Sequence, residues 1–512
     1  MREIVAVLDF GSQYAQLITR RIRECGIYSE ILPHDISAQE LASLNPKAVV
    51  LSGGPASVLD GTHPGIDRDI LFSGMPVLGI CYGLQLMSLE LGGSIERGHS
   101  REYGPAFIHI KGDTPLFFGL GSRADVWMSH GDHVGVPPEG FQILAHTASC
   151  PVAAMGDSER KLYGVQFHPE VVHTPRGLEI IKNFLFSIAG CTGGWSMAGF
   201  IQEAIRTIRS EVKDSRVICG LSGGVDSAVV AALLNEAIGK NMTAIFVDNG
   251  LLRAGEVDEI REIFTRVYPL NLDVVDAQDA FLDGLKGITD PEDKRKIIGK
   301  VFIDVFYKEA ARIGGAEYLA QGTLYPDIIE STSAKGGPSA TIKSHHNVGG
   351  LPEDLQFTLI EPLKELFKDE VRALGRELGL PGSIVDRQPF PGPGLAVRIL
   401  GEVTRENITI LQEADTRVQE ELSAYEGYPD IWQAFAVLLS VKSVGVMGDE
   451  RTYANVIAIR AVSSLDGMTA DWAKLPYDVL GRISTRIINE VEGVNRVVYD
   501  ISSKPPSTIE WE

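Results

Sequence analysis

The 512-residue chain has few basic residues, few cysteines and no long apolar run. It carries 47 Lys and Arg against 68 Asp and Glu, a net charge of −21, so we expect no broad surface for nucleic acid or for an anionic membrane. The five cysteines are odd in number and include no CxxC pair, which favours the reducing cytoplasm over a disulfide framework. No segment approaches the ~18 apolar residues of a membrane span, and the apolar run at residues 4–8 is too short for a signal peptide.

What the sequence does have is an alternation of short β-branched runs with helical stretches, the α/β pattern. A glycine-rich stretch at residues 189–195 and a Pro/Gly-rich stretch at 389–394 interrupt this pattern. At roughly 150 residues per domain, we expect three domains: residues 1–190 and 197–387, both α/β, and 388–512, a small α+β module. The expected strands are residues 4–8, 48–51, 76–80, 162–167, 216–221, 243–247, 456–462 and 496–501.

Cys81 lies within GICYG at residues 79–83, between an expected strand and an expected helix at 84–91. Glycines on both sides of a nucleophile allow a strained turn that exposes the side chain at the end of the strand. The N-terminal end of the following helix favours the thiolate form of the cysteine. We therefore predict that Cys81 is a nucleophile.

A thiolate nucleophile needs a base, a carboxylate to orient that base, and donors for a developing oxyanion. The strand ending at Phe167 is followed by His168 and Glu170, which we predict to be the base and the orienting carboxylate. The glycines that follow another strand place backbone amides close to a ligand, so we predict an oxyanion hole formed by the N–H groups of Gly54 and Tyr82.

Together these strand-end features resemble the class I glutamine amidotransferases over about residues 3–190, including DFGSQY at residues 9–14. The resemblance implies a flavodoxin-like domain. It also implies that Cys81, His168 and Glu170 hydrolyse glutamine through a glutamyl-thioester and release ammonia.

The second domain contains SGGVDSA at residues 222–228, again between a strand and a helix. Hydroxyls and glycine amides at a helix N-terminus can surround phosphate oxygens, and no Lys follows as in the loop that serves γ-phosphate transfer. The stretch resembles the PP-loop of N-type ATP pyrophosphatases, which implies an adenine-nucleotide α-hydrolase-like domain that releases AMP and pyrophosphate. The ATP-binding residues are then predicted to be Ser222, Gly223, Gly224, Val225, Asp226, Ser227, Ala228, Val247, Gly322 and Lys368. Asp226 and, from the family, Glu370 are predicted to hold Mg²⁺.

An amidotransferase fused to an ATP pyrophosphatase implies that an oxygen of the acceptor molecule is first adenylated. Nitrogen then displaces this adenylated oxygen. Residues 290–299, 389–394 and 503–512 closely resemble the GMP synthetase family, with all parts in the same order. The resemblance implies a ligase that adenylates the C2 oxygen of XMP, lets ammonia displace AMP, and forms a homodimer through its C-terminal domain. From the same resemblance, the residues predicted to bind XMP are Arg295, Pro391, Gly392, Pro393, Gly394, Lys504, Ile509 and Glu510.

Other patterns in the sequence predict a further feature or leave alternative functions open. The Ser/Gly-rich segment at residues 331–350 is predicted to be a lid over the adenylate. The pairs His130/His133 and His345/His346 lack a Cys or carboxylate at the usual ligand spacing, so we expect no metal site there. A glutamine-dependent NAD synthetase, a tRNA-thiolating PP-loop enzyme, a regulatory protein with decayed sites and an interaction scaffold are the alternative hypotheses.

Overall fold

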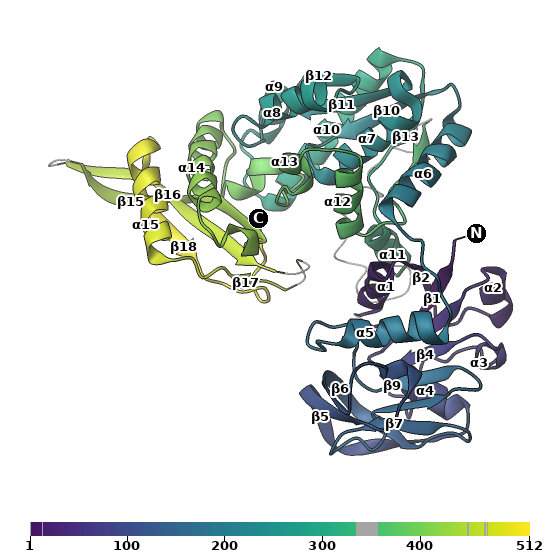
Figure 1. The fold of residues 1–512 in the computed structure, drawn as a ribbon. Helices are drawn as coiled ribbons and strands as arrows, with labels where there is room; N and C mark the ends of the chain where they lie inside the picture. Colours follow the sequence, from purple (N-terminus) through teal and green to yellow (C-terminus); the bar gives the residue numbers. More distant parts are fainter. Residues whose placement is uncertain (1, 13, 334–356, 448–449, 465–466, 468) are drawn as a thin grey trace. The chain divides into compact units, whose positions relative to one another are not determined.

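The computed structural model describes residues 2–12, 14–333, 357–447, 450–464, 467 and 469–512. The chain divides into two compact units, residues 1–200 and 201–512, and the boundary falls within helix α6 (Met197–Val212) (Figure 1). Within these described stretches, no helix is long and apolar enough to cross a membrane.

The first unit is built on a mixed sheet with the strand order β2-β1-β3-β4-β9-β8-β7-β5-β6 (Figure 1). Strands β2, β1, β3, β4 and β9 run parallel, and the pairs from β9 to β6 are antiparallel. The strands are β1 (Ile4–Asp9), β2 (Tyr28–Pro33), β3 (Ala48–Leu51), β4 (Val77–Ile80), β5 (Ser94–Ile110), β6 (Arg123–Val136), β7 (Gln142–His146), β8 (Ala154–Asp157) and β9 (Leu162–Val165).

Both faces of the parallel part of this sheet are buried, because helices pack on each of them. Successive side chains of a strand point to opposite faces and therefore enter different cores. Val5 and Val7 of β1 pack into one core with α1 and α5, whereas Ala6 and Leu8 pack into a second core with α2, α3 and α4. Polar groups on these strands are therefore confined to their ends, where the candidate residues lie. The helices are α1 (Ala15–Glu24), α2 (Ala38–Ser43), α3 (Asp69–Phe72), α4 (Tyr82–Glu90) and α5 (Gly177–Lys182), with a 3₁₀ turn at Pro115–Phe117 and a π-helical segment at Asn183–Ile188.

The second unit begins with a parallel sheet of strand order β12-β11-β10-β13-β14. Helix α7 packs against β10 and β11, and α12 packs against α7. The strands are β10 (Arg216–Leu221), β11 (Met242–Asp248), β12 (Leu272–Asp276), β13 (Ala316–Ala320) and β14 (Thr358–Ile360). The helices are α7 (Val225–Ile238), α8 (Glu256–Glu262), α9 (Gln278–Leu285), α10 (Pro291–Ile313), α11 (Tyr325–Ser333), α12 (Lys368–Glu377) and α13 (Gly382–Val385). Short 3₁₀ or π-helical segments lie at Gly239–Asn241, Ile263–Val267 and Gly394–Arg398.

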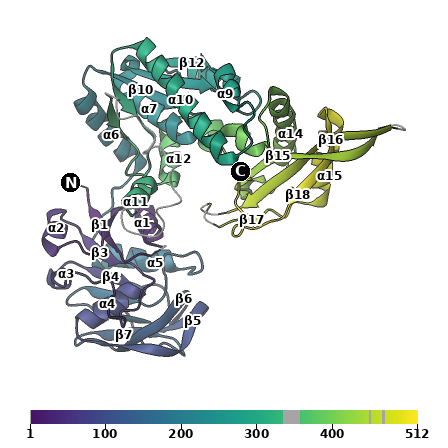
Figure 2. The same ribbon diagram turned by 180° about the vertical axis from the view of Figure 1, so that it is seen from behind.

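The rest of the second unit is a smaller sheet in which β16 pairs with β15, β17 and β18. One face of β15, with Ala434 and Ala436, packs into a core with α14 and α15, and the other face carries Phe435 and Val437 (Figure 2). The elements are α14 (Arg405–Ser423), β15 (Gln433–Met447), β16 (Glu450–Ser463), β17 (Asp471–Trp472), α15 (Tyr477–Glu490) and β18 (Val494–Asp500), with a 3₁₀ turn at Tyr428–Asp430.

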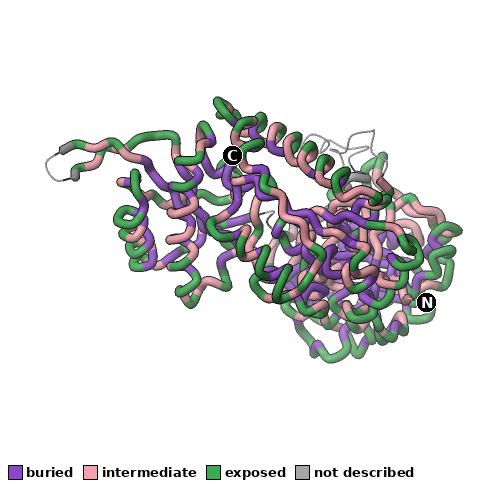
Figure 3. Tube along the Cα trace, turned by 90° about the horizontal axis from the view of Figure 1, so that it is seen from above, coloured by how far each residue is buried: buried purple, intermediate pink, exposed green. Residues whose placement is uncertain are grey.

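A single cluster of buried side chains runs through the second unit, from Ile218 on β10 to Val494 on β18. Figure 3 shows that exposed and intermediate residues make up the outer part of the β15–β16 hairpin, whereas buried residues lie further inside the unit. The division of this unit at residue 388, expected from the Pro/Gly-rich stretch, stays a prediction.

Candidate active sites

Cys81 lies on a sharp turn between β4 and α4. Its backbone has φ 52° and ψ −103°, a conformation that costs a non-glycine residue about 1–3 kcal/mol and that the surrounding structure must hold. The turn also brings two backbones together, since a Cβ at Gly83 would lie only 2.4 Å from the carbonyl oxygen of Leu51. Gly83 is thus required by the close approach of Leu51. The turn is strained, as predicted from the sequence, but the prediction that it exposes the Cys81 side chain is wrong, since this residue is buried at 6% exposure.

His168 and Glu170 follow β9, which lies next to β4 in the sheet. Nδ1 of His168 lies 2.7 Å from Oε1 of Glu170, and both side chains are buried. The His168 backbone N–H donates to the carbonyl of Trp127 at 3.0 Å, and its carbonyl accepts from the Thr174 hydroxyl at 2.6 Å. These contacts fix the imidazole with Nδ1 on the carboxylate, which leaves Nε2 for the nucleophile.

The side chains of His168 and Cys81 both lie close to Gly53. A Cβ built on Gly53 would lie 3.2 Å from Cε1 of His168 and 3.9 Å from Cβ of Cys81. Burial lowers the pKa of His168, but the Glu170 carboxylate and the contact with Cys81 together raise this pKa above its ordinary value. The geometry therefore favours an imidazolium beside the sulfur, the arrangement of an activated thiolate.

Two groups that contact the sulfur were missed by the sequence analysis. The fully buried Gln166 donates from Nε2 to Sγ of Cys81 at 3.6 Å, and Sγ lies 3.6 Å from the carbonyl oxygen of Ser129, to which it donates while it is protonated. Because side chains alternate along an extended chain, Gln166 lies on the same side as His168, a signal that could have identified it. Ser129 belongs to β6 and has no such signal.

The predicted oxyanion donors lie beside each other. A Cβ on Gly54 would lie 3.4 Å from Cγ of Tyr82 and 2.8 Å from the carbonyl oxygen of Phe10, so only glycine fits there. Tyr82 is the first residue of α4, where a backbone N–H has no acceptor within the helix. The role of this pair as an oxyanion hole stays a prediction.

Residues 222–224 join β10 to α7, and residues 225–228 form the first turn of that helix. Gly223 has φ +78°, which favours glycine. The hydroxyls of Ser222 and Ser227 lie 3.0 Å apart, and Ser227 also donates to the Gly224 carbonyl at 3.1 Å. A loop closed in this way at the N-terminus of a 14-residue helix suits phosphate oxygens. The side chains of Val225 and Ala228 are buried, so only their backbone can meet a nucleotide.

Asp226, Lys368 and Gly322 gather beside this loop. Lys368 forms an ion pair with Oδ2 of Asp226, and a Cβ on Gly322 would lie 3.4 Å from Cβ of Asp226. The sheet order explains the grouping, because β10 lies between β11, which carries Val247, and β13, which precedes Gly322. Oδ1 of Asp226 is buried and has no hydrogen-bond partner among the described residues, so it can receive a cation.

Glu370, the second predicted metal ligand, caps the helix that carries Lys368. Its Oε2 accepts from the backbone N–H of Phe367 at 2.9 Å. This contact places the carboxylate at the start of α12, near the residue that pairs with Asp226. Its role toward Mg²⁺ stays a prediction.

Arg387 contacts the loop that contains Gly223 and was not predicted from the sequence. Its Nη1 donates to the Gly223 carbonyl at 2.9 Å and lies 3.0 Å from Oε1 of Glu256, while Nη2 lies 2.7 Å from Oε2 of Glu259. The arginine thus holds the strained glycine through its carbonyl. It is separated from Gly223 by more than a hundred residues, so spacing alone could not indicate it.

The C-terminal tail brings together several of the predicted XMP-binding residues. Arg295 of α10 donates to the Glu512 carbonyl at 2.5 Å. Glu510 accepts two hydrogen bonds from the fully buried Arg398, at 2.8 and 3.0 Å. Gln433 donates to both Glu510 and the Pro389 carbonyl, at 2.9 and 3.1 Å. The tail therefore contacts α10, and Glu510 is held by Arg398 and by Gln433, which also contacts Pro389.

Lys504 and Ile509 make other contacts. The Lys504 ammonium donates to the Gly467 carbonyl at 2.8 Å, whereas Ile509 packs against the face of the small sheet that carries Phe435 and Val437. The structure thus connects Arg295 to the C-terminal tail at Glu512, connects Glu510 to Pro389 through Gln433, and ties Lys504 to a separate loop. The XMP assignments stay predictions.

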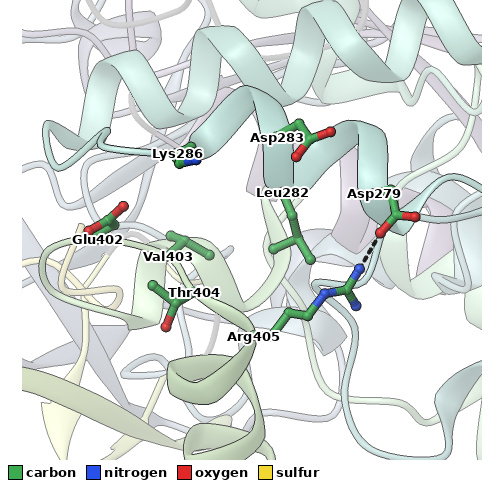
Figure 4. Close-up of a pocket in the computed structure, with 8 residues that line it drawn as sticks. All are labelled: Asp279, Leu282, Asp283, Lys286, Glu402, Val403, Thr404 and Arg405. Atoms are coloured by element: carbon green, nitrogen blue, oxygen red, sulfur yellow. Dashed lines mark hydrogen bonds and ion pairs between the residues drawn. The ribbon is translucent and has the colours of Figure 1, made fainter.

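A further pocket of about 280 Å³ lies between α9 and the start of α14 (Figure 4). Arg405 and Asp279 form an ion pair across it. None of the residues that line it is a predicted site residue, so we assign it no part in the chemistry. They are Asp279, Leu282, Asp283, Lys286, Glu402, Val403, Thr404 and Arg405.

The segment predicted to be a lid, residues 331–350, lies outside the described residues except for 331–333, the last backbone of α11. The pair His345/His346 lies outside them as well.

Known protein families match three parts of the chain. The glutamine amidotransferase class-I family matches residues 6–188, the NAD synthase family residues 198–264, and the GMP synthase C terminal domain residues 420–511. Fold and site together define a class I glutamine amidotransferase joined to an ATP-using PP-loop synthetase.

The chain is also similar to curated proteins over its whole length. It is 58% identical over 511 residues to the GMP synthase [glutamine-hydrolyzing] of Geobacillus kaustophilus, covering 100% of both chains. It is 57% identical to that of Caldanaerobacter subterraneus subsp. tengcongensis, covering 100% of this chain and 99% of the other. It is 54% identical to that of Clostridium perfringens, covering 100% of both. The chain belongs to the glutamine-hydrolysing GMP synthase family.

Proposed function

We propose that this chain divides its reaction between two active sites, one around Cys81 and one around the loop at residues 222–228. The reaction is the synthesis of GMP from XMP, ATP and glutamine, with AMP, pyrophosphate and glutamate as the other products. The observation that carries this division is the joint presence of a buried Cys–His–Glu arrangement and a closed PP-loop in one chain of this family.

In the first site, the Cys81 thiolate attacks the carboxamide carbon of glutamine. The proton held by His168 passes to the leaving nitrogen, which departs as ammonia, and water then hydrolyses the glutamyl-thioester to glutamate. Glu170 holds the imidazole through its 2.7 Å contact. The backbone N–H groups of Gly54 and Tyr82 donate to the oxyanion.

In the second site, the PP-loop binds the β- and γ-phosphates of ATP as the leaving group. The C2 oxygen of XMP attacks the α-phosphorus and pyrophosphate leaves; ammonia then attacks C2 and AMP leaves. Lys368 neutralises phosphate charge beside Asp226. Mg²⁺, when bound, supplies further charge neutralisation on the phosphates, and the residues that would hold it are Asp226, through its unpartnered Oδ1, and Glu370.

XMP is proposed to bind where the tail crosses α10 and the loop at residues 391–394. Arg295 and Lys504 supply cations for the 5′-phosphate, and Glu510 accepts from a purine or ribose donor. Ile509 and the glycines of the loop shape the surface beside them. The carboxylate of Glu510 is already oriented by Arg398, which supports a fixed role in recognition.

A homodimer through the C-terminal part is proposed from an exposed apolar surface on the β15–β16 hairpin. Val444 pairs with Tyr453 across the hairpin, and Val446 lies two residues further along the same face. These side chains are 50%, 68% and 73% exposed. A second copy that covers this surface would remove it from water.

Light scattering of the full chain tests the dimer. Val446→Lys should shift the molecular mass toward that of one chain, because a charge would be buried in the interface. Tyr477→Lys, at an exposed aromatic residue of α15, is the matched control and should leave the mass unchanged. A wild-type chain with the mass of a monomer would refute the dimer.

A reducing, cytoplasmic location is also proposed. All five cysteines are free thiols, which supports this location.

Nucleotide product analysis tests the proposed function as a whole. The chain is incubated with XMP, ATP and Mg²⁺ and with either glutamine or ammonium. GMP, AMP and pyrophosphate should form with both nitrogen sources, and glutamate with glutamine alone. Absence of GMP from both mixtures would reject the acceptor.

A further inference from the structure

Three side chains of the types that can bind a metal lie close together near the turn at Cys81, although they come from distant parts of the first unit. Glu102 lies on β5, His130 on β6, and Cys150 after β7. One ligand atom from each, a carboxylate oxygen, an imidazole nitrogen and the thiol sulfur, lies within 4.8 Å of the other two. We expected no metal site at His130/His133, since no Cys or carboxylate lies at the usual ligand spacing. The partners of His130 are instead brought to it from distant parts of the chain by the fold.

The orientation of His130 leaves Nε2 available. Nδ1 lies 3.1 Å from the carbonyl oxygen of Asp132, which can only accept, so the proton sits on Nδ1. Nε2 then faces Oε2 of Glu102 at 3.3 Å but has no hydrogen-bond partner among the described residues. The residue is 8% exposed.

With its proton on Nδ1, the ring turns the Nε2 lone pair toward the Glu102 carboxylate, so a cation bound here would take one ligand atom from each side chain. A backbone carbonyl on Nδ1 is also the usual outer contact of a metal-bound histidine. The carboxylate is oriented too, because the Thr147 hydroxyl donates to Oε1 of Glu102 at 3.1 Å.

Cys150 completes the set with a soft ligand. It is fully buried, and burial together with the negative charge of Glu102 raises the pKa of its thiol to about 12. A coordinating thiol loses its proton outright, and here that proton would pass to solvent. The resulting thiolate and the Glu102 carboxylate would neutralise a divalent ion.

We propose that Glu102, His130 and Cys150 form a binding site for Zn²⁺. One oxygen, one imidazole nitrogen and one thiolate are the ligand types that Zn²⁺ takes, and three protein ligands leave one tetrahedral position for water. The site is separate from the Mg²⁺ proposed for the reaction. It lies next to the glutaminase centre, because the neighbouring carbonyl of Ser129 accepts from Sγ of Cys81.

The test uses the full chain with Cys81→Ala, which removes the other thiol beside this site. After removal of metals, Co²⁺ is added as a spectroscopic probe and is then displaced with Zn²⁺. One equivalent of Co²⁺ should bind per chain and produce a thiolate-to-cobalt absorption band, and one equivalent of Zn²⁺ should abolish the band. No band on Co²⁺ addition would overturn the proposal.

Variants in the same background identify the ligands. Cys150→Ser should remove the band and weaken Zn²⁺ binding at least tenfold, and His130→Gln should weaken it to a similar degree. Cys191→Ser, at another buried cysteine of the same unit, is the matched control and should leave both unchanged. Glu102→Gln keeps the size of the side chain, so it decides the question if Cys150→Ser fails to fold. An unchanged Zn²⁺ affinity in Glu102→Gln would contradict the site.

Discussion

Replacement of Glu510 by alanine should destabilise the second unit as well as weaken XMP binding. Glu510 is the partner of Arg398, whose side chain is fully buried, through hydrogen bonds of 2.8 and 3.0 Å. Its removal would leave a buried guanidinium without its carboxylate, which costs about 3–5 kcal/mol. At about 1.4 kcal/mol per factor of ten, the unfolding constant of this unit should rise by about 10²- to 10⁴-fold.

Hydrogen exchange read peptide by peptide measures this effect separately in the two units. Exchange from residues 201–512 should accelerate in Glu510→Ala, whereas peptides from residues 2–200 should keep their wild-type rates and act as an internal control. Glu492→Ala, at an exposed carboxylate of the same unit, should change neither. The KM for XMP should rise far more than the KM for ATP. A loss of less than 1 kcal/mol in Glu510→Ala would refute the view that Arg398 depends on this carboxylate.

Two further predictions concern the catalytic groups. Glu170→Gln removes the negative charge that raises the pKa of His168 against the effect of burial, so this pKa should fall. The alkaline limb of the pH profile of kcat/KM for glutamine should therefore move to lower pH. The rate of glutamine hydrolysis should also fall by on the order of 10²-fold or more. An unmoved pH profile would show that the carboxylate does not act through the imidazole. Asp226→Asn should abolish AMP formation with either nitrogen source, because it weakens the contact with Lys368 and the proposed cation ligand together, and retained AMP formation would reject its placement there.

The sequence was most informative where chemistry is set by short spacing. The turn at Cys81 and the pair His168/Glu170 each fit within a few residues of one strand end, so their local geometry follows from chain direction and glycine placement. The strands predicted in the two larger sheets, β1, β3, β4, β9, β10 and β11, match the structure within two residues, because each is a short and mostly buried apolar run. Of the parallel strands, β2, β12, β13 and β14 were not predicted; each is only partly buried and so lacks a continuous apolar pattern.

Features formed by contacts between distant segments were not predictable in this way. Arg387 reaches the loop at Gly223, and Arg398 reaches Glu510, across more than a hundred residues in each case. Strand β16 begins at Glu450, six residues before the predicted start. Its residues 451–454 pair with β15 while their side chains are exposed or only half-buried, and such a stretch lacks an apolar pattern. The buried arginines could be found only once the fold placed them.

The claim that this chain has two separate active sites is tested most directly by Cys81→Ala. GMP formation is measured with XMP, ATP and Mg²⁺, once with glutamine and once with high ammonium. Synthesis from glutamine should be abolished, because no thiolate remains to release ammonia, while synthesis from ammonium should proceed at the wild-type rate. Loss of synthesis from both nitrogen sources, or retention of both, would contradict the two-site account.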